Sequence, residues 1–578
     1  MSQLIGDNPC RPRHFRPAPC GPAPTEGPAK DALEISHTRL LIAGALFVLA
    51  FMTIAARLIE VGGFKSADLH IARLHPAAKP DIARADIVDR NGTLLATTLD
   101  VPSLFANPKQ VQDKRGTAHA LAAILPETSE AELYARLTSD KSFVWLGRQL
   151  TPRQEYAVNQ LGIPGLDFAT EGKRVYPKGN LAAHVVGYSG IDNNGLAGIE
   201  RGLDDTLKMQ TGPVQLSIDA RLQYILRSET ARQMAQFEAQ AATGLIMDVH
   251  TGEVLALVSL PDFDLNAAGS AKPEAMFDRA TLGVYEVGSI FKIFNTAMAL
   301  DAHTATLASR YDATKPIEIA GFTIHDDHPL KRWLSVPEIF EYSSNIGAAK
   351  MAAEAGTERQ RDMLGRLGLL HAPSFELPEL GVPMIPRPWL PISTMTVAFG
   401  HGISVSLLQV ASATSAAING GMLYPPTILK RPDGVPVQGQ RVLSPQTSTD
   451  MRKLLRLVVE DGTGKYADAP GYVVGGKTGT AEKAENGRYA THALMSSFVG
   501  AFPMNDPRYV VIVMLDEPKP HPGASATGGM VAAPAVARII ERMAPIVGIQ
   551  PVDENSPEIR RSLMVGSPSP QGRKLAAN

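Results

Sequence analysis

The chain has 578 residues, of which 44% are hydrophobic and 20% charged, an ordinary globular composition with room for two or three substantial domains. Its 56 basic and 58 acidic residues give a formal net charge of −2, so the overall charge does not indicate a nucleic-acid partner. The only cysteines, Cys10 and Cys20, lie near the N-terminus, which excludes disulfides and cysteine-based metal clusters from the main body. The 14 histidines show no ligand spacing such as His-x-x-x-His, and we therefore expect neither a metal nor another cofactor.

The N-terminal part of the chain combines a polar tail with one long apolar run. Residues 1–38 are rich in proline and polar residues and lack periodicity, which predicts a disordered tail. From Leu40 to Ala56 the chain carries no charge, and apolar residues beyond Arg57 extend the run to about 20 residues, enough to span a bilayer. Basic residues before the run favour a cytoplasmic N-terminus. We therefore predict a cytoplasmic tail at 1–38, a transmembrane anchor at 39–60, and an extracytoplasmic location for everything beyond.

A cleaved signal peptide is the main alternative interpretation of the apolar run. The long leader before the run and the absence of a clear small-x-small cleavage site favour an uncleaved anchor. A buried core helix is a weaker alternative, because no polar face accompanies the run.

Residues 61–212 show a mixed pattern that predicts a separate domain. Residues 85–96 are typical of two strands joined by a tight turn at Asn91 and Gly92. Two later stretches, 174–179 and 195–202, are dense in glycine, proline and charge. Because no nucleophile–base pair stands out here, we expect a structural role, as a spacer or a partner-binding platform.

From Leu216 onward the pattern predicts an α+β domain. Asp219 is suited to cap a helix that runs to about Phe237. Two hairpins are predicted, one from the apolar runs 245–249 and 254–258 and one from 497–502 and 509–515. The segments between the hairpins are mainly helical, including a helix at 405–419, and a closing helix at 535–547 follows the second hairpin. This pattern predicts one antiparallel sheet with terminal helices packed on it and a large helical insert, over residues 213–548. Residues 549–578 are polar and rich in proline and serine, which predicts a flexible tail.

Ser289 and Lys292 begin an almost entirely apolar stretch that ends at Leu300. Such a stretch predicts a helix buried on most sides, on which residues three apart share one face. A buried lysine is unfavourable unless it has a partner or a task, and a desolvated lysine is able to activate a serine as a nucleophile. A surface lysine beside a helix-capping serine is the ordinary alternative, and Ser-x-x-Lys alone is a weak signal.

Two further motifs strengthen the catalytic interpretation. The chain holds Ser343-Ser344-Asn345 at the start of a helical stretch, and Lys477-Thr478-Gly479 followed by Thr480 after the strand-like residues 472–474. Taken singly, each motif has an ordinary alternative interpretation: Ser343 would cap a helix, and residues 477–480 would form a solvated loop. The ordered triple of Ser-x-x-Lys, Ser-x-Asn and Lys-Thr-Gly is the motif set of penicillin-binding proteins and serine β-lactamases.

On these residues the chain resembles a class B penicillin-binding protein, the membrane-anchored D,D-transpeptidase family that cross-links peptidoglycan. The resemblance extends from the anchor to about residue 548 and includes Asp89-Arg90-Asn91-Gly92, Arg174-x-Tyr176-Pro177 and Gly198-x-Glu200. It implies a serine β-lactamase-like transpeptidase domain behind a class B dimerisation-type pedestal domain. Asn345 and the stretch 496–500 are most similar to the division-specific, FtsI-type (septal) branch.

The resemblance implies a role for each catalytic residue. Ser289 would attack the carbonyl of the penultimate D-Ala of a stem peptide, with Lys292 as the base. Burial and the nearby cation of Lys477 would disfavour protonated Lys292. Ser343 would relay a proton to the leaving amine, and Asn345 would hold Lys292 and the substrate amide.

The remaining motif residues are expected to bind the substrate. Lys477 and the hydroxyls of Thr478 and Thr480, on either side of Gly479, suit the terminal carboxylate. The backbone N–H groups of Ser289 and Thr480 would form an oxyanion hole. An acceptor amine would then resolve the ester and form the cross-link, whereas a β-lactam would leave a slowly hydrolysed ester.

The resemblance also implies a location and partners, and it leaves alternatives. The expected location is the cytoplasmic (inner) membrane, single-pass, with the catalytic domain in the periplasm or extracytoplasmic space, beside a polytopic glycan polymerase and other divisome proteins. Alternatives are an elongation-specific transpeptidase, a carboxypeptidase or β-lactamase-type hydrolase, and a divisome scaffold or β-lactam sensor. A hydrolase needs an activated deacylating water, and residues 61–212 are too few for an added glycan-polymerising domain.

Overall fold

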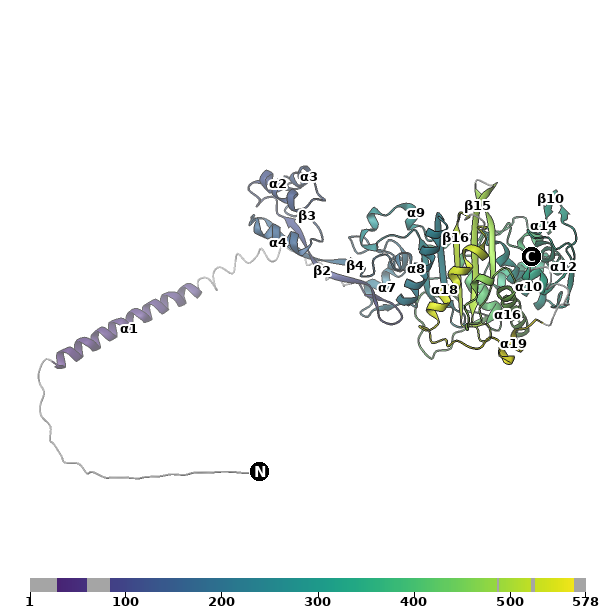
Figure 1. Cartoon of the computed structure of the whole chain (residues 1–578). Coiled ribbons are helices and arrows are strands. Elements are labelled where there is room, and N and C mark those ends of the chain that lie inside the picture. The colour runs from purple at the N-terminus through teal and green to yellow at the C-terminus, as the bar shows by residue number, and fades with distance from the viewer. Residues whose placement is uncertain (1–28, 60–83, 486–487, 521–524, 566–578) are drawn as a thin grey trace, which may run out of the picture. The chain divides into compact units, whose positions relative to one another are not determined.

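The computed structural model describes residues 29–59, 84–485, 488–520 and 525–565 (Figure 1). The chain divides into two compact units, residues 1–81 and 82–578. In the first unit the described residues form a long helix, α1 (Ala29–Ile59), which carries the apolar run. Apolar side chains within the run are exposed, with Leu41 70% and Phe47 69% accessible. No helix among the described residues combines the length and apolarity that crossing a membrane requires. The predicted disordered tail is wrong for residues 29–38, which are helical, and residues 1–28 lie outside the described part.

The second unit is built around a five-stranded antiparallel sheet, as the sequence predicts. Its strands, in spatial order, are β14 (Gly475–Glu485), β15 (Arg488–Phe502), β16 (Tyr509–Asp516), β6 (Ala241–Asp248) and β7 (Val254–Leu260). The two predicted hairpins, β6–β7 and β15–β16, are thus confirmed, and the pairing of β16 with β6 joins them into one sheet. Strand β14 has β15 as its only neighbour in this sheet, so its other edge is available to the helical segments.

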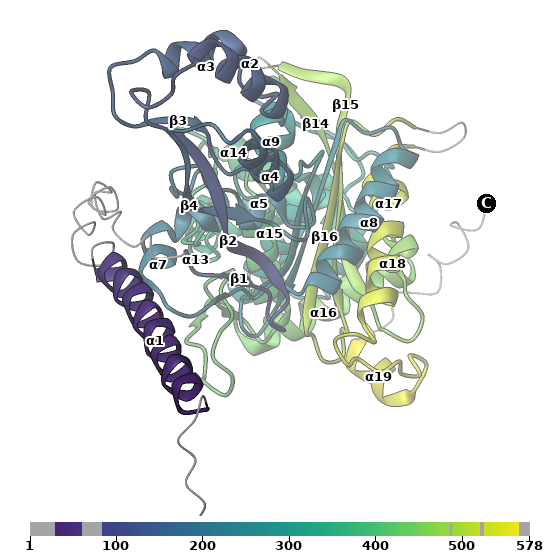
Figure 2. The same ribbon diagram turned by 90° about the vertical axis from the view of Figure 1, so that its left-hand side faces the viewer.

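Strands β6, β7 and β16 are apolar at almost every position, as expected for strands that are buried on both faces. Along β16, Val511 and Val513 belong to a core shared with α8 (Ala220–Gln236) and α18 (Ala533–Met543). Figure 2 shows these two helices side by side on one face of the sheet. The alternate residues Val510 and Ile512 face a larger core, which contains the helices inserted between β7 and β14. Asp219 accepts a hydrogen bond from the backbone of the first turn of α8, which confirms the predicted cap.

The inserted helices cover the second face of the sheet. The described elements between β7 and β14 are η3 (Leu265–Ser270), α9 (Pro273–Met276), η4 (Gly288–Phe291), α10 (Lys292–Asp301), β8 (Arg310–Asp312), β9 (Ile317–Ile319), β10 (Phe322–Ile324), β11 (Trp333–Ser335), α11 (Val336–Glu341), α12 (Asn345–Ala355), α13 (Thr357–Arg366), α14 (Pro391–Val397), α15 (Leu407–Ile418), β12 (Met422–Leu423), β13 (Gln440–Arg441), α16 (Pro445–Glu460) and η5 (Lys465–Ala467). Helix α10 is buried from Lys292 to Leu300 and contacts α12, α13, α15 and α16. It is therefore the central helix of this layer.

Residues 84–215 form a smaller, mixed domain around a second sheet. Its strands are β1 (Ile87–Val88), β2 (Leu94–Ala106), β3 (Val144–Gly147), β4 (Leu166–Val175) and β5 (Val214–Gln215), in the order β3-β2-β1-β5 with β4 paired to β2. Strands β1 and β2 form the predicted hairpin, and Gly92 has φ +85°, as the tight turn requires. The helices are α2 (Lys114–Ile124), α3 (Glu130–Leu137), α4 (Pro152–Gln160), α5 (Ala183–Val186), α6 (Gly198–Gly202) and α7 (Asp204–Met209).

A buried ion cluster joins the two glycine- and charge-rich stretches of this domain. Glu200 is completely buried, and its carboxylate pairs with Arg84 through one oxygen and with Arg174 through the other, at 2.6 Å. Arg84 also pairs with Asp204 at 2.7 Å. The motifs around Arg174 and Glu200 therefore have a structural explanation, because they supply the two halves of one cluster.

Replacing Glu200 should destabilise this domain strongly. Glu200→Ala leaves two buried guanidinium groups without their shared counter-charge, and we expect it to lower the unfolding free energy by about 3–5 kcal/mol. Glu132→Ala is the control, because Glu132 forms an exposed ion pair with Arg136 and should cost at most about 1 kcal/mol. Chemical denaturation of both variants measures this difference, and similar losses would show that the buried cluster adds no stability of its own.

The predicted flexible tail at 549–578 is wrong for the residues up to 565. Helix α19 (Pro557–Leu563) follows β16 and α18, and Leu563 is 7% exposed. Glu554 accepts a hydrogen bond from the backbone N–H of Gly471 and forms an ion pair with Arg456 at 2.7 Å. These long-range contacts hold the segment in place, and a polar composition does not reveal them. Residues 566–578 lie outside the described part of the chain.

Candidate active site

Ser289 lies in the short helix η4, at the entrance to the central helix α10. The preceding residue, Gly288, has φ +55°, and a methyl group on it would lie 2.4 Å from the carbonyl oxygen of Thr480. Only glycine therefore permits this turn to approach the backbone of β14 so closely. The turn brings the serine next to the edge strand that carries the Lys477-Thr478-Gly479 motif.

Lys292 meets residues of two separate motifs, although it is only 1% exposed. Its Nζ lies 2.9 Å from Ser289 Oγ, 2.7 Å from Asn345 Oδ1, and 2.5 Å and 3.0 Å from the carbonyl oxygen and Oγ of Ser343. Burial lowers the pKa of Lys292 to about 7, although the negative charges of Asp326 and Asp327 act in the opposite direction. A substantial fraction of this lysine is therefore a neutral amine near neutral pH.

The hydrogen-bond partners of Lys292 orient its lone pair. The carbonyl oxygen of Ser343 and Oδ1 of Asn345 are acceptors only, so each must receive an N–H from Lys292. A neutral amine has two N–H groups and one lone pair, and these two acceptors use both N–H groups. The lone pair is then left for the hydroxyl of Ser289 or Ser343, which is the arrangement needed to remove a proton from the serine nucleophile.

Lys477 places a second amine on the other side of Ser343. Its Nζ is 3.0 Å from Ser343 Oγ, and the side chain is completely buried. Burial, together with the charge of Lys292, lowers the pKa of Lys477 well below its ordinary value. The hydroxyl of Ser343 thus lies between two amines that compete for protons, a geometry suited to proton relay.

The turn that carries Ser343 and Asn345 is held by a neighbouring loop. Ser343 has φ +58°, an unfavourable backbone conformation for a residue other than glycine. Asp326 accepts hydrogen bonds from Ser344 Oγ at 2.8 Å and from the backbone N–H of Ile346 at 2.9 Å. The carbonyl of His325 accepts a hydrogen bond from Asn345 Nδ2 at 3.1 Å. Sequence reasoning missed this loop, since its polar residues look like those of any solvated turn.

Thr478, Gly479 and Thr480 lie on β14 itself, which corrects the prediction of a strand at 472–474 followed by the motif. Val473 has φ +47°, which is incompatible with a strand, and β14 begins only at Gly475. Thr478 is 8% exposed and its hydroxyl lies 3.0 Å from that of Thr463. The hydroxyl of Thr480 accepts a hydrogen bond from the backbone N–H of Gly528 at 3.1 Å.

Six of the eight predicted residues are thus joined by direct hydrogen bonds, namely Ser289, Lys292, Ser343, Asn345, Lys477 and Thr478. Thr478, Gly479 and Thr480 continue the strand from Lys477, and the backbone of Thr480 lies against Gly288. The structure therefore brings the three motifs together around the hydroxyl of Ser289.

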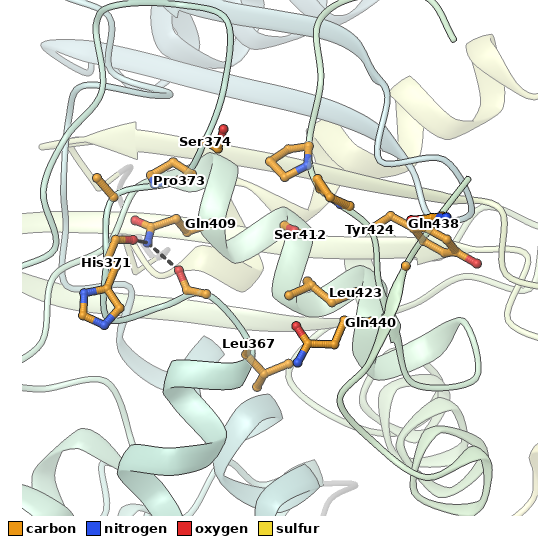
Figure 3. Close-up of a pocket in the computed structure, with 15 residues that line it drawn as sticks. Leu367, His371, Pro373, Ser374, Gln409, Ser412, Leu423, Tyr424, Gln438 and Gln440 are labelled. Atoms are coloured by element: carbon orange, nitrogen blue, oxygen red, sulfur yellow. Dashed lines mark hydrogen bonds between the residues drawn. The ribbon is translucent and has the colours of Figure 1, made fainter. Parts of the chain in front are cut away.

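A separate cavity lies away from this cluster (Figure 3). It has a volume of about 490 Å³, and none of the eight predicted residues lines it. Gln409 extends along its wall and donates hydrogen bonds to the carbonyl oxygens of Gly368 and His371 at 2.8 Å and 2.9 Å. The cavity is therefore separate from the hydrogen-bonded cluster around Ser289.

Comparison with known families agrees with this geometry. Residues 242–541 match the penicillin-binding protein transpeptidase domain, which covers all three motifs. The chain belongs to the penicillin-binding protein transpeptidase family. Residues 81–236 match the penicillin-binding protein dimerisation domain, and they include the hairpin β1–β2 and the buried cluster around Glu200.

Individual relatives of this penicillin-binding protein support the assignment along most of the chain. It is 42% identical over 483 residues to the probable peptidoglycan D,D-transpeptidase FtsI of Caulobacter vibrioides, covering 81% of this chain and 82% of the relative. Among solved structures, it matches the transpeptidase domain of Burkholderia pseudomallei penicillin-binding protein 3 with a TM-score of 0.53 and 35% identity, over 58% of this chain and 98% of that one. It also matches Mycobacterium tuberculosis penicillin-binding protein 3 in complex with ampicillin, with a TM-score of 0.66 and 25% identity, over 84% and 99% of the two chains.

Proposed function

We propose that this protein is a peptidoglycan D,D-transpeptidase that works through an acyl-enzyme on Ser289. The observation that carries the proposal is the contact of 2.9 Å between Ser289 Oγ and Lys292 Nζ, made by a buried lysine whose two N–H groups have acceptors in Ser343 and Asn345. A serine with a neutral amine at this distance is an activated nucleophile for acyl transfer. The family match and the FtsI relative support peptidoglycan stem peptides as the substrate.

In the first half of the reaction, Ser289 Oγ attacks the carbonyl carbon of the penultimate D-Ala and Lys292 accepts the hydroxyl proton. The tetrahedral intermediate collapses when the bond to the terminal D-Ala nitrogen breaks. Ser343 donates a proton to that nitrogen and is reprotonated by the lysine pair, because its Oγ lies 3.0 Å from each Nζ. The products are free D-Ala and an ester on Ser289.

In the second half, the amine of another stem peptide attacks the ester and forms the cross-link. The amine loses a proton to the lysine pair, and Ser289 Oγ recovers one as it leaves. We assign Asn345 to hold Lys292 and the substrate amide, and Lys477, Thr478 and Thr480 to bind the terminal carboxylate of the donor. Their position on the edge strand β14 supports this assignment, because a bound peptide is able to lie along that edge.

The oxyanion hole is assigned to the backbone N–H groups of Ser289 and Thr480. The close approach of Gly288 to the Thr480 backbone supports this, since it brings the two peptide groups into one small region. Loss of one donor from such a site costs other acyl-transfer enzymes about 3–4 kcal/mol of transition-state stabilisation. Gly479 permits the same approach, as a methyl group on it would lie 2.4 Å from the carbonyl oxygen of Val287.

We further propose that β-lactams acylate Ser289 and that α1 anchors the protein in the inner membrane. The ampicillin complex of the related M. tuberculosis protein supports the first assignment. The exposed apolar side chains of α1, from Leu41 to Ile54, and the basic residues before them support the second. The catalytic domain would then lie in the periplasm or another extracytoplasmic space.

A septal role is proposed from Asn345 and from the FtsI relative. Residues 84–215 would then serve as a platform for a polytopic glycan polymerase and other divisome proteins. Depletion of the protein distinguishes the two roles, because cells should filament if it acts in division, whereas rounding would indicate elongation.

A donor–acceptor assay separates transfer from hydrolysis. The full chain in detergent is incubated with a thioester analogue of the donor stem peptide and an acceptor D-amino acid, and the products are separated by mass spectrometry. A transpeptidase should form more of the amide than of the free acid once the acceptor is in excess. Predominant free acid would indicate a carboxypeptidase, and the absence of turnover with correct folding would favour a scaffold or sensor.

The acylation rate should rise with pH through an acid limb centred near 7. The base is the neutral form of Lys292, whose pKa is lowered to about 7, so the rate should fall about tenfold for each unit below the midpoint. Because the two lysines interact through Ser343, the observed midpoint belongs to the pair. Acylation rates with a fluorescent penicillin between pH 5 and 9 measure it. A midpoint near 10, the ordinary value for lysine, would contradict the assignment of Lys292 as the base.

A further inference from the structure

The loop of His325 and Asp326 is hydrogen-bonded to the turn that carries Ser343 and Asn345. Asp326 is 7% exposed and has two oxygens that receive the hydroxyl of Ser344, at 3.0 Å and 2.8 Å. One of these oxygens also receives the backbone N–H of Ile346, in the first turn of α12. The carboxylate therefore holds the chain on both sides of Asn345.

This attachment controls the geometry around Lys292. Ser343 accepts from Lys292 through its backbone carbonyl, at 2.5 Å, as well as through its Oγ, at 3.0 Å. The position of that carbonyl is set by a backbone with φ +58° at Ser343. Such a conformation costs about 1–3 kcal/mol and persists only where surrounding contacts enforce it. Ser344 and Ile346 are the residues through which Asp326 enforces it, and the His325 carbonyl fixes the Asn345 side chain in the same way.

The charge of Asp326 acts on the same lysine. Among the described residues, Asp326 forms no ion pair within 4 Å, so its negative charge is compensated by hydrogen-bond donors and by more distant cations. It faces the N-terminus of α12, where the helix dipole favours an anion. The charged and titratable groups that act on Lys292 are Lys477 on β14 and Asp326 and Asp327 in the loop, and the two carboxylates favour protonated Lys292.

We propose that Asp326 is a positioning residue for acyl transfer, which holds the strained Ser343–Asn345 turn against Lys292 and supplies a counter-charge to that buried lysine. This inference rests on the proposed function. It assigns two separable effects to one side chain, because its hydrogen bonds set the geometry while its charge sets the pH range of the base.

The test compares the pH profile of penicillin acylation in the full-length protein and three variants. Asp326→Asn retains an oxygen acceptor but removes the charge, so the acid limb should move to lower pH by at least about half a unit, with a lower plateau. Asp327→Asn is the matched control, because Asp327 is exposed and its effect should be small and suppressed by 0.5 M salt. Ser344→Ala removes a hydrogen-bond donor but no charge, so it should lower the rate about tenfold at every pH with an unchanged midpoint.

Each outcome has a defined meaning. An Asp326→Asn profile that coincides with the wild type in midpoint and plateau overturns the inference while leaving the proposed function intact. If this variant does not fold, Ser344→Ala decides, since a wild-type rate overturns the inference and a uniform loss at an unchanged midpoint supports it. If the wild type itself is not acylated at Ser289, the proposed function fails first and the inference fails with it.

Discussion

Ser289→Ala should abolish acylation by penicillin, lowering the second-order rate constant by roughly 10⁴-fold or more. The reason is that Ser289 Oγ is the hydroxyl 2.9 Å from the buried amine of Lys292, at the turn where Gly288 meets β14. Alanine removes the attacking atom but fits the same helical position, so the fold should be retained. Gel fluorescence with a labelled penicillin, together with a thermal melt, measures both properties.

Ser270→Ala is the matched control for this experiment. Ser270 is exposed at the end of η3, and its hydroxyl bonds only to the carbonyl of Ala267 in the same short helix. Ser270→Ala should have an acylation rate within about a factor of two of the wild type, because surface substitutions usually have small effects. Substantial labelling of Ser289→Ala at the wild-type rate would show that another residue is the nucleophile.

Lys292→Met should lower the acylation rate by about 10²–10⁴-fold, the usual contribution of a general base. Methionine fills a similar volume in the buried helix, so Ser289 remains in place but has no amine within hydrogen-bond distance. The acid limb near pH 7 should disappear from the residual activity, because Lys292 is the group whose pKa is lowered to that range. Loss of the acid limb distinguishes removal of the base from a general distortion of the site.

Lys350→Met is the control for charge removal from the helical layer. Lys350 lies on α12, contacts Asp312, and its side chain is 35% exposed. The Lys350→Met variant should retain the wild-type acylation rate and pH profile. If Lys292→Met keeps an acid limb near pH 7, the base is another group, and Lys477 would be the first candidate because its pKa is also lowered.

The five-stranded sheet and its two terminal helices could be predicted because their local sequence patterns, apolar runs and a helix cap, favour the same elements that the fold contains. The strands of β6 and β16 are apolar at almost every position, and Asp219 caps α8 by a contact between residues two apart in sequence. The hairpin at Gly92 could be predicted for the same reason, because its turn is formed by residues that are adjacent in the sequence. The start of β14 could not be predicted, because the positive φ of Val473 depends on tertiary packing and apolar residues 472–474 look like a strand.

The motif residues of the site could be identified, whereas the residues that support them could not. Ser289, in η4, and Lys292, at the start of α10, are only three residues apart, so their contact is local and the sequence predicts it. Asp326 contacts Ser344 from a loop with no distinguishing pattern, and Glu554 reaches Gly471 from a segment whose composition predicts flexibility. Such contacts depend on how distant segments meet, and only the folded structure reveals them.

The most direct test of the account is the intact mass of the full chain, followed over time after addition of benzylpenicillin and combined with peptide mapping. We predict one adduct, mapped to Ser289, that persists long after the free drug is removed, as expected for a transpeptidase with poor access of water to its ester. No adduct on a folded sample, or an adduct on another residue, would contradict the assignment of Ser289. An adduct that clears quickly while penicillin is consumed would contradict transpeptidation and identify a hydrolase.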